Sequence, residues 1–471
     1  MIRSAALIVA AIYLCGHWLA GLSVAVLLLI WRMLPAREGP PVLALAMTTQ
    51  WTQVTIGVFY AGLTGRPMVT IERSEYQPMV LMGLASVVAL TVGLAAGRTW
   101  VWRPDAGRRP AELASWNQLF GAYLVAVVTR GVLQQVAWSY PTLTQAILAF
   151  GFIHLALLFL VLRRLVAPTL ESRWIAGLLA FEVALGFTGY FSDFKEPLLL
   201  GVLALLETFD SRRLQHWVLG AACAAVLGLA CVMWLAVRAE YRQDFDTELF
   251  SASRVTRLER VQALMTDWLR ERSGGVSEVV DDLVDRGWAI YYPALAVARV
   301  PAVLPHTGGQ IMGDAIIHLV TPRILFPNKP ELMSDSEMVR RFSGVMVAGA
   351  EHNTSIAFGY VAESYVDFGV PLMFLPMLVF GIGCGAAYEW FLRTIRHHEL
   401  AVSLVTVVFW LGLFLFERAW ARTLGLTITM MVYLGGISFL LDRWLLMHRD
   451  EHAQAPEIEA GAATIGGADP W

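Results

Sequence analysis

Long apolar runs separated by short basic segments dominate the sequence. Runs of about 18–25 apolar residues match the length of a helix that crosses the hydrocarbon core of a bilayer. Gly16 and His17 interrupt the first run, so a broken, re-entrant pair of helices is an alternative to a single helix there. The expected spans are residues 4–31, 40–63, 78–97, 117–137, 142–162, 174–191, 196–209, 216–237, 371–392, 399–417 and 424–441.

Composition supports the same class. Hydrophobic residues make up 57% of the chain and charged residues only 15%, outside the range of an ordinary soluble domain. The sequence therefore predicts an all-α polytopic membrane protein with about 11 transmembrane helices, or about 12 if the first run is a pair. All four cysteines lie in apolar segments, which favours neither a disulfide framework nor a metal site.

The distribution of arginine predicts the orientation of the chain, because basic loops stay on the cytoplasmic side. Alternate loops are rich in arginine, whereas the loops between them hold few basic residues: Arg66, Arg73, Lys195, Arg418 and Arg422. We expect the N-terminus outside and the C-terminus inside a bacterial inner membrane. The expected divisions are a helix bundle (1–237), a large periplasmic loop (238–370), C-terminal helices (371–445) and a disordered tail (446–471).

The large loop begins with "SASRVTRLERVQALMTDWLRER", where apolar residues recur at helical spacing beside a stripe that includes Arg254 and Arg257. This pattern predicts an amphipathic helix, lying on lipid headgroups or on the bundle. A cationic wall that holds an anionic, lipid-linked substrate is the alternative. A second apolar segment, residues 281–300, is too interrupted by charge and proline to predict a span.

A stiff, charged stretch follows at residues 321–337, "TPRILFPNKPELMSDSE". Its three prolines remove backbone donors and force the preceding residues out of the helical region. We expect an extended loop that presents Arg323 and Lys329 at the mouth of the bundle. Lys195 and Lys329 are the two lysines of the chain, and both fall on the expected outer side.

Several segments of this region resemble the Wzy-type oligosaccharide repeat-unit polymerases of bacterial O-antigen and exopolysaccharide pathways. The segments are "TPRILFPNKP", "AESYVDFGVP", "GYFSDFKEPLLLGVLALL" and "SRVTRL", within residues 185–385. The resemblance implies transfer of a growing glycan from undecaprenyl diphosphate to a hydroxyl of another lipid-linked repeat unit. It implies no cofactor, no metal and no nucleic acid, with a chain-length regulator and a flippase as further partners.

Such a reaction needs fixed cations for the diphosphate leaving group and a general base for the acceptor hydroxyl. For the base, His352 in "GAEHNTS" titrates nearest to neutral pH. Glu363 and Asp367 lie four residues apart on one helical face, where they could orient a hydroxyl or only pair with arginine. The candidate cations are Arg323, Lys329, Arg254, Arg257 and Lys195.

Ionisable residues inside the expected spans form a second group of candidates, since charge in hydrocarbon is costly and usually faces the bundle interior. Arg130, His154 and Glu182 lie in three successive spans. An internal Arg130–Glu182 pair that fixes helix packing is one interpretation. A polar vestibule for sugars, with Arg130 binding substrate, is the other.

The sequence also contains weaker candidate motifs, and two other functions remain as alternatives. The acidic pair in "DFD" (Asp244, Asp246) is a poor metal motif, and Glu72 and Glu75 in the first outer loop rank below His352 as candidate acids. A ligase that moves a finished glycan to a terminal acceptor uses the same chemistry. A flippase or transporter is a different class, for which we find no internal repeat.

Overall fold

A computed structural model describes residues 2–65, 76–101, 114–139, 144–166, 171–188, 194–210, 212–244, 252–271, 276–321, 326, 328–349 and 355–453. Within these ranges the regular structure is entirely α-helical, as the sequence predicts. The helices are α1 (Ile2–Cys15), α2 (Trp18–Met33), α3 (Val42–Thr64), α4 (Tyr76–Trp100), α5 (Trp116–Ser139), α6 (Thr144–Val166), α7 (Ser172–Phe187), α8 (Lys195–Glu207), α9 (Leu214–Asp244), α10 (Arg254–Glu271), α11 (Val276–Gly287), α12 (Tyr291–Arg299), α13 (Gln310–Val320), α14 (Asp335–Ser343), α15 (Tyr360–Phe368), α16 (Phe374–Thr394), α17 (His398–Leu413) and α18 (Trp420–Ala453).

Each predicted span coincides with a helix, except that the first is divided into α1 and α2. The chain reverses at Gly16, whose φ of 65° is a conformation that glycine adopts without strain. His17 then caps α2, because its Nδ1 accepts a hydrogen bond from the Leu19 amide at 3.1 Å. The interrupted form of the first run is therefore the one the structure contains.

Helix length and apolar composition together support some of the predicted spans and leave the predicted number unconfirmed. In the described part of the chain, five helices could cross a membrane: Val42–Thr64, Tyr76–Trp100, Leu214–Trp234, Phe374–Thr394 and Trp420–Trp444. Segments Ser4–Cys15, Trp18–Met33, Gln310–Val320 and His398–Leu413 are apolar but shorter. These helices agree with a membrane protein, and the predicted number of about 11 spans stays a prediction.

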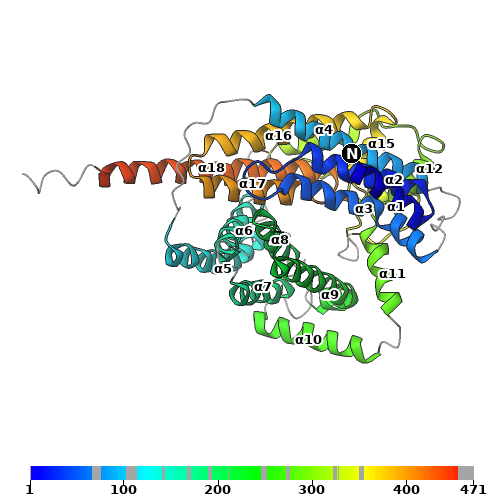
Figure 1. The fold of residues 1–471 in the computed structure, drawn as a ribbon. Helices are drawn as coiled ribbons and strands as arrows, with labels where there is room; N and C mark the ends of the chain where they lie inside the picture. Colours follow the sequence, from blue (N-terminus) through cyan, green and yellow to red (C-terminus); the bar gives the residue numbers. More distant parts are fainter. Residues whose placement is uncertain are drawn as a thin grey trace, which may run out of the picture.

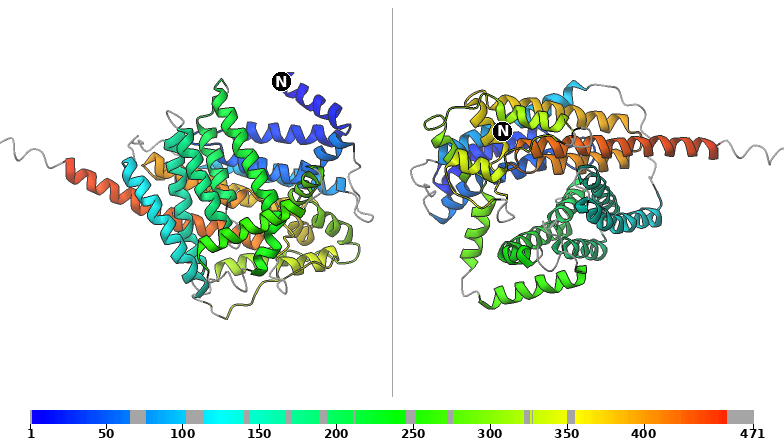
Figure 2. Two further views of the ribbon diagram at one scale, coloured as in Figure 1. Left: turned by 90° about the horizontal axis from the view of Figure 1, so that it is seen from below. Right: turned by 180° about the vertical axis from the view of Figure 1, so that it is seen from behind.

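The helices form two layers (Figure 1). The upper layer contains α1–α4 and α16–α18, and the lower layer contains α5–α10, whose helices run across the direction of the upper ones (Figure 2, left). Helix α6 joins the layers by packing on α17 and α18. Helices α2, α4 and α16 terminate at one end of the upper layer, which we call the basic end. Helices α12–α15 cover the beginning of α18 at the opposite end, which we call the loop end.

Helices α4 and α16 cross at very close range through paired glycines. Gly93 and Gly97 on α4 face Gly381 and Gly385 on α16, each pair at the G-x-x-x-G spacing that lets membrane helices approach closely. A Cβ atom added to Gly381 would lie 2.6 Å from the Leu90 carbonyl oxygen, and one added to any of the other three would also strike a carbonyl oxygen of the partner helix. This crossing holds the centre of the upper layer together.

The large loop is more helical than the sequence suggested. The amphipathic helix is α10, but only part of its apolar face is covered: Val261 is buried, whereas Val255 remains 66% exposed. The second apolar segment is two helices, α11 and α12. At the C-terminus, α18 continues to Ala453, into the segment expected to be disordered, and residues 454–471 lie outside the described ranges.

Candidate functional site

Helix α15 carries Glu363 and Asp367 one turn apart, as the sequence predicted, and both side chains are buried. Asp367 accepts hydrogen bonds from the backbone amides of Ile311 (3.1 Å) and Met312 (2.8 Å) and from the hydroxyl of Thr307. These amides belong to the first turn of α13, whose N–H groups have no partner within the helix. Asp367 is therefore the N-terminal cap of α13, supplied by a different helix.

Asp367→Asn is expected to lower the free energy of unfolding by about 2 kcal/mol, because the amide turns a donor toward backbone donors. The check is the thermal unfolding midpoint of the detergent-purified variant beside Asp314→Asn, an exposed position on α13 that should change little. Lost activity with an unchanged midpoint would contradict the capping role and favour the predicted catalytic role.

Glu363 makes the equivalent contact with α18. Its carboxylate accepts the backbone amide of Trp420 at 2.7 Å, and the indole N–H of Trp420 donates to Ser364 at 2.7 Å. Burial raises the pKa of Glu363 to about 8, and the nearby carboxylates of Asp335 and Asp367 add to the rise. A pKa near neutrality suits acid–base chemistry, but the carboxylate is 3% exposed and already caps a helix.

The raised pKa makes stability depend on pH. The folded protein holds the Glu363 proton that the unfolded chain releases near its ordinary pKa of 4.5, so stability is lost as pH rises from about 4.5 to about 8. Glu363→Gln keeps an oxygen acceptor for Trp420 and carries no charge. We expect its free energy of unfolding to match that of the unaltered protein at pH 5 and to exceed it by a few kcal/mol at pH 9. Parallel pH profiles would rule this out.

The remaining predicted residues of the large loop divide into two groups. Lys329 donates from its ammonium group to the carbonyl oxygens of His318 and Thr321, both at 2.9 Å, and so caps the C-terminus of α13. With Asp367 at its other end, α13 is held at both termini by residues of the two motifs quoted above. Arg323 and His352 lie outside the described residues, so their predicted roles stay predictions.

The candidate residues of the expected spans form one chain of contacts in the lower layer. Arg130 on α5 contacts His154 on α6 (Nη1 to Nδ1, 3.3 Å), and His154 contacts Glu182 on α7 (Nε2 to Oε1, 2.9 Å). The Tyr123 hydroxyl donates to the same Glu182 oxygen. Arg130 and Glu182 are thus connected through His154, which contacts both of them. These contacts fix the packing of three helices.

The predicted cations of α10 lie beside this chain of contacts. Arg254 packs on α5, where a Cβ added to Gly131 would lie 2.9 Å from its Nη2 atom. Burial lowers the pKa of Arg254, and the charges of Arg130 and Arg257 lower it further. Three of the predicted substrate-binding arginines therefore come together, whereas Lys195 stands apart, exposed at the start of α8.

A second group of arginines, which the sequence analysis did not select, lies between α9, α11 and the turn from α17 to α18. Arg238 has a pKa lowered by burial and by the neighbouring charges of Arg286 and Arg242. Arg286 pairs with Glu417 at 3.4 Å. We call Arg238, Arg242, Arg286 and Arg418 the arginine cluster.

Arg418 is the most enclosed member of the arginine cluster. Its Nη1 donates to the Leu411 carbonyl at 2.6 Å, and the guanidinium lies over the Phe414 ring at 5.5 Å. Burial lowers its pKa to about 10, and the charge of Glu196 opposes that shift. Arg418 stays charged at neutral pH and is positioned by the end of α17.

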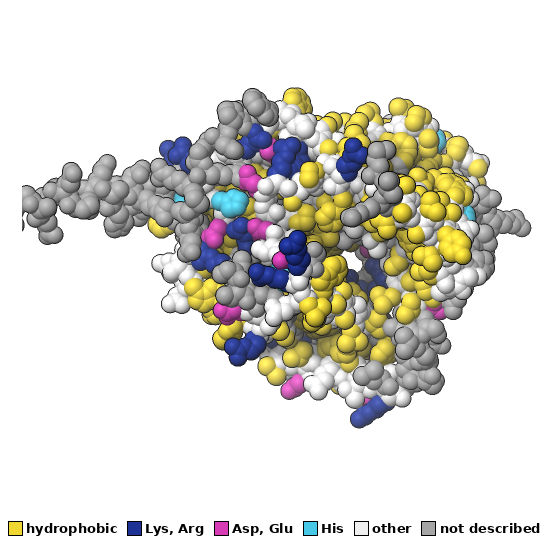
Figure 3. All heavy atoms as spheres, in the orientation of Figure 1, with side chains coloured by type: hydrophobic (Ala, Val, Ile, Leu, Met, Phe, Trp, Pro, Cys, Tyr) yellow, Lys and Arg dark blue, Asp and Glu magenta, His cyan; other side chains and the backbone are white. Residues whose placement is uncertain are grey.

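Basic side chains gather around Glu417. Arg238 lies within the influence of Arg242, Arg286 and Glu417, and Arg418 within that of Glu196, Arg422 and Glu417, so Glu417 is common to both groups. Figure 3 shows a hollow between α9, α11 and the upper layer, with basic side chains at its edge. Guanidinium groups gathered in this way suit a multiply charged anion, which they bind through paired N–H donors. In the described ranges, no three acidic, histidine or cysteine side chains gather as metal ligands do.

One signal in the sequence could have indicated this cluster. Arg238 and Arg242 lie at the start of the large loop and Arg286 lies within it, and Arg418 lies in the short segment between the last two expected spans, which contains few other basic residues. Their proximity depends on how α9, α11 and α18 pack, since Arg286 and Glu417 are 131 residues apart.

Comparisons with known proteins identify a family. No curated protein and no solved structure matches the chain. The family match covers residues 111–394, more than half of the chain, and includes the arginines of α5, α9, α10 and α11. The chain belongs to the family described as Domain of unknown function (DUF8712).

Proposed function

We propose that this protein is a glycosyltransferase that polymerises undecaprenyl-diphosphate-linked oligosaccharide repeat units. The observation that carries the proposal is the arginine cluster, because several guanidinium groups in one place suit a diphosphate. Its position at the loop end, between the helix bundle and the large loop, supports a substrate that is anchored in lipid. The resemblance of the large loop to Wzy-type polymerases supports the same reaction.

The chemistry assigns a role to the cluster. An acceptor hydroxyl oxygen attacks the anomeric carbon of the donor, the glycosyl–phosphate C–O bond breaks, and its electron pair passes to the lipid diphosphate. Arg238 and Arg286 stabilise the charge that develops on the leaving phosphate. The hydroxyl proton passes to a base, for which His352 remains the predicted residue, since the carboxylates of Glu363 and Asp367 cap helices.

The proposal includes an orientation. The loop end faces the periplasm of a bacterial cell and the basic end faces the cytoplasm, in agreement with the arginine bias of the loops. The arginines of α10 line the route from the lipid surface, where Arg254 and Arg257 attract the donor. A flippase supplies the repeat units, and a chain-length regulator acts on the product.

Mass spectrometry of lipid-linked saccharides from cells that lack the gene tests the class of function, with outer-leaflet accessibility measured on the same cells. The proposal predicts single repeat units trapped on the outer leaflet. Long lipid-linked chains on that leaflet would show a ligase instead. Units confined to the inner leaflet would show a flippase, and unchanged saccharides would exclude all three.

A further inference from the structure

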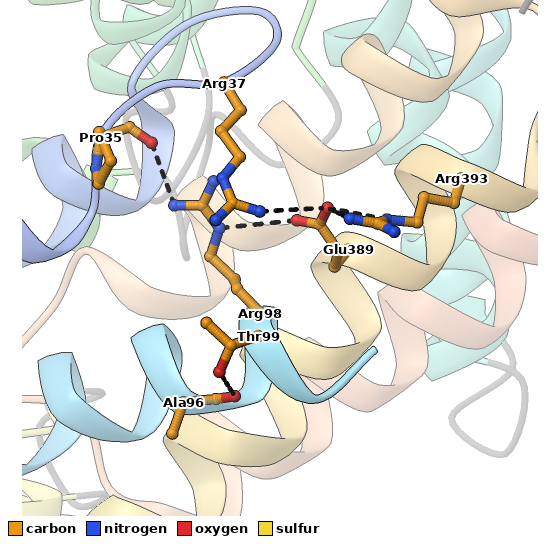
Figure 4. Close-up of polar contacts among 7 residues, drawn as sticks. All are labelled: Pro35, Arg37, Ala96, Arg98, Thr99, Glu389 and Arg393. Atoms are coloured by element: carbon orange, nitrogen blue, oxygen red, sulfur yellow. Dashed lines mark hydrogen bonds and ion pairs between the residues drawn. The ribbon is translucent and has the colours of Figure 1, made fainter. Parts of the chain in front are cut away.

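A second basic cluster lies at the basic end, far from the arginine cluster along the upper layer. Figure 4 shows three arginines from three elements around one carboxylate: Arg37 from the turn between α2 and α3, Arg98 from α4, and Glu389 and Arg393 from α16. Arg393 donates to Glu389 Oε1 from Nε at 2.9 Å, and Arg37 Nη1 lies 3.7 Å from that oxygen. Arg98 Nε lies 3.7 Å from the other oxygen. We call these four residues the Glu389 cluster.

Hydrogen bonding within the cluster is incomplete. Arg98 is 5% exposed and donates from Nη1 to the Pro35 carbonyl at 3.1 Å, while its guanidinium lies over the Tyr388 ring. Its buried Nε has no hydrogen-bond acceptor, and Glu389 Oε2 has no hydrogen-bond donor, because the 3.7 Å that separates these two atoms is too long for a hydrogen bond. A buried donor without an acceptor is costly, which indicates a missing partner.

The charge is also unbalanced. Three guanidinium groups pair with the Glu389 carboxylate, and Glu38, next to Arg37 in the chain, lies 3.7 Å from His398. When the two carboxylates are subtracted from the three arginines, one positive charge is left over. The C-termini of α2, α4 and α16 meet the N-termini of α3 and α17 at this end, and their partial charges of about half a unit each leave about half a unit of negative charge, less than the surplus of the guanidinium groups. An excess of positive charge remains, and Arg37, half exposed, brings it to the surface.

Exposed tryptophans place the cluster at the level of lipid headgroups. Trp31, Trp100 and Trp390 are 41%, 78% and 42% exposed, and they lie near the ends of α2, α4 and α16, the helices that terminate around the cluster. Tryptophan is enriched at the membrane–water interface, where its ring is buried and its N–H is solvated. The anion that reaches Arg37 from this direction is a headgroup of the surrounding bilayer.

We infer that the Glu389 cluster binds the phosphate of an anionic phospholipid, which bridges Arg37 and the buried Arg98. The phosphate oxygens supply acceptors to guanidinium N–H groups, and the negative charge offsets the excess arginine. Occupancy holds the turn between α2 and α3 against the ends of α4 and α16. The lipid therefore stabilises the fold at the end opposite the proposed reaction.

The test uses full-length protein in neutral detergent and follows thermal unfolding during titration with phosphatidylglycerol, phosphatidylcholine or inorganic phosphate. Phosphatidylglycerol at about 100 times its dissociation constant should raise the midpoint by about 3 °C. Arg37→Gln should lose at least half of that rise. Arg32→Gln, an exposed arginine on the last turn of α2, is the matched control and should keep all of it.

Three results would overturn the inference. One is an equal shift in Arg37→Gln and the unaltered protein, and another is an equal shift with phosphatidylcholine. A saturable shift with inorganic phosphate alone would show a site for free phosphate rather than for lipid. Because Arg37 is half exposed and its ion pair is long, Arg37→Gln should unfold at the unaltered midpoint when no lipid is present.

Discussion

Gly385→Leu is expected to remove most of the folded protein, with a loss of about 4 kcal/mol in the free energy of unfolding. A Cβ at Gly385 would strike the carbonyl oxygen of Leu94, which belongs to the backbone of α4 and cannot rotate aside. The two helices must separate, and the contacts of Gly93, Gly97 and Gly381 are lost with them. Fluorescence size-exclusion chromatography and thermal unfolding measure this loss.

The matched control is Gly383→Leu, two residues earlier on the same helix. A Cβ there meets nothing within 4 Å, so the variant keeps the crossing and has the same gain in helix propensity. It should be recovered in normal yield with a midpoint close to that of the unaltered protein. Equal behaviour of the two variants would show that the glycine pairs do not govern the packing of α4 on α16.

Arg238→Gln is expected to lower polymer synthesis about 100-fold, because one charge-assisted contact with the leaving diphosphate contributes about 3 kcal/mol to transition-state stabilisation. Removing one member of a crowded cationic group also relieves repulsion from Arg286 and Arg242, so the folded protein should be no less stable. Arg238→Lys keeps the charge but not the paired donors, and an intermediate loss of about 10-fold is expected. Polymer length and yield in cells carrying each variant provide the measurement.

Arg270→Gln controls for the loss of any arginine from the large loop. Arg270 is 76% exposed on α10, and its ion pair with Asp267 is 3.9 Å long, so its removal should leave both stability and polymer unchanged. Full polymer in stably inserted Arg238→Gln would show that the arginine cluster is structural. A similar loss in Arg270→Gln would attribute the effect to the overall charge of the loop.

Helix positions were largely predictable because a long apolar run can satisfy its backbone hydrogen bonds only as a helix. The expected span 78–97 is α4 (Tyr76–Trp100), and 371–392 is α16 (Phe374–Thr394). The sequence indicated either one long helix or a pair of helices broken at Gly16. The packing of α1 against α2 favours the pair. The number of crossings was less predictable, because α8 has 13 residues, fewer than the roughly 20 that a span needs.

The sequence indicated which kinds of residue to examine as site residues, but it predicted less well which groups they contact. Glu363 and Asp367 lie on one face of α15 as their spacing requires, yet each carboxylate meets the start of a different helix. Their role as caps depends on where α13 and α18 begin in space, which no local pattern contains. The same holds for Arg238 and Arg286, whose proximity arises from the packing of α9 on α11.

The most direct test of the central claim is release of lipid diphosphate by the purified, full-length protein in liposomes. The substrate is the lipid-linked repeat unit extracted from cells that lack the gene. The account predicts that longer lipid-linked chains form and that one undecaprenyl diphosphate is released for each new linkage, with both products reduced about 100-fold in Arg238→Gln. Repeat units that cross the bilayer, or remain unchanged, without any released diphosphate would contradict it.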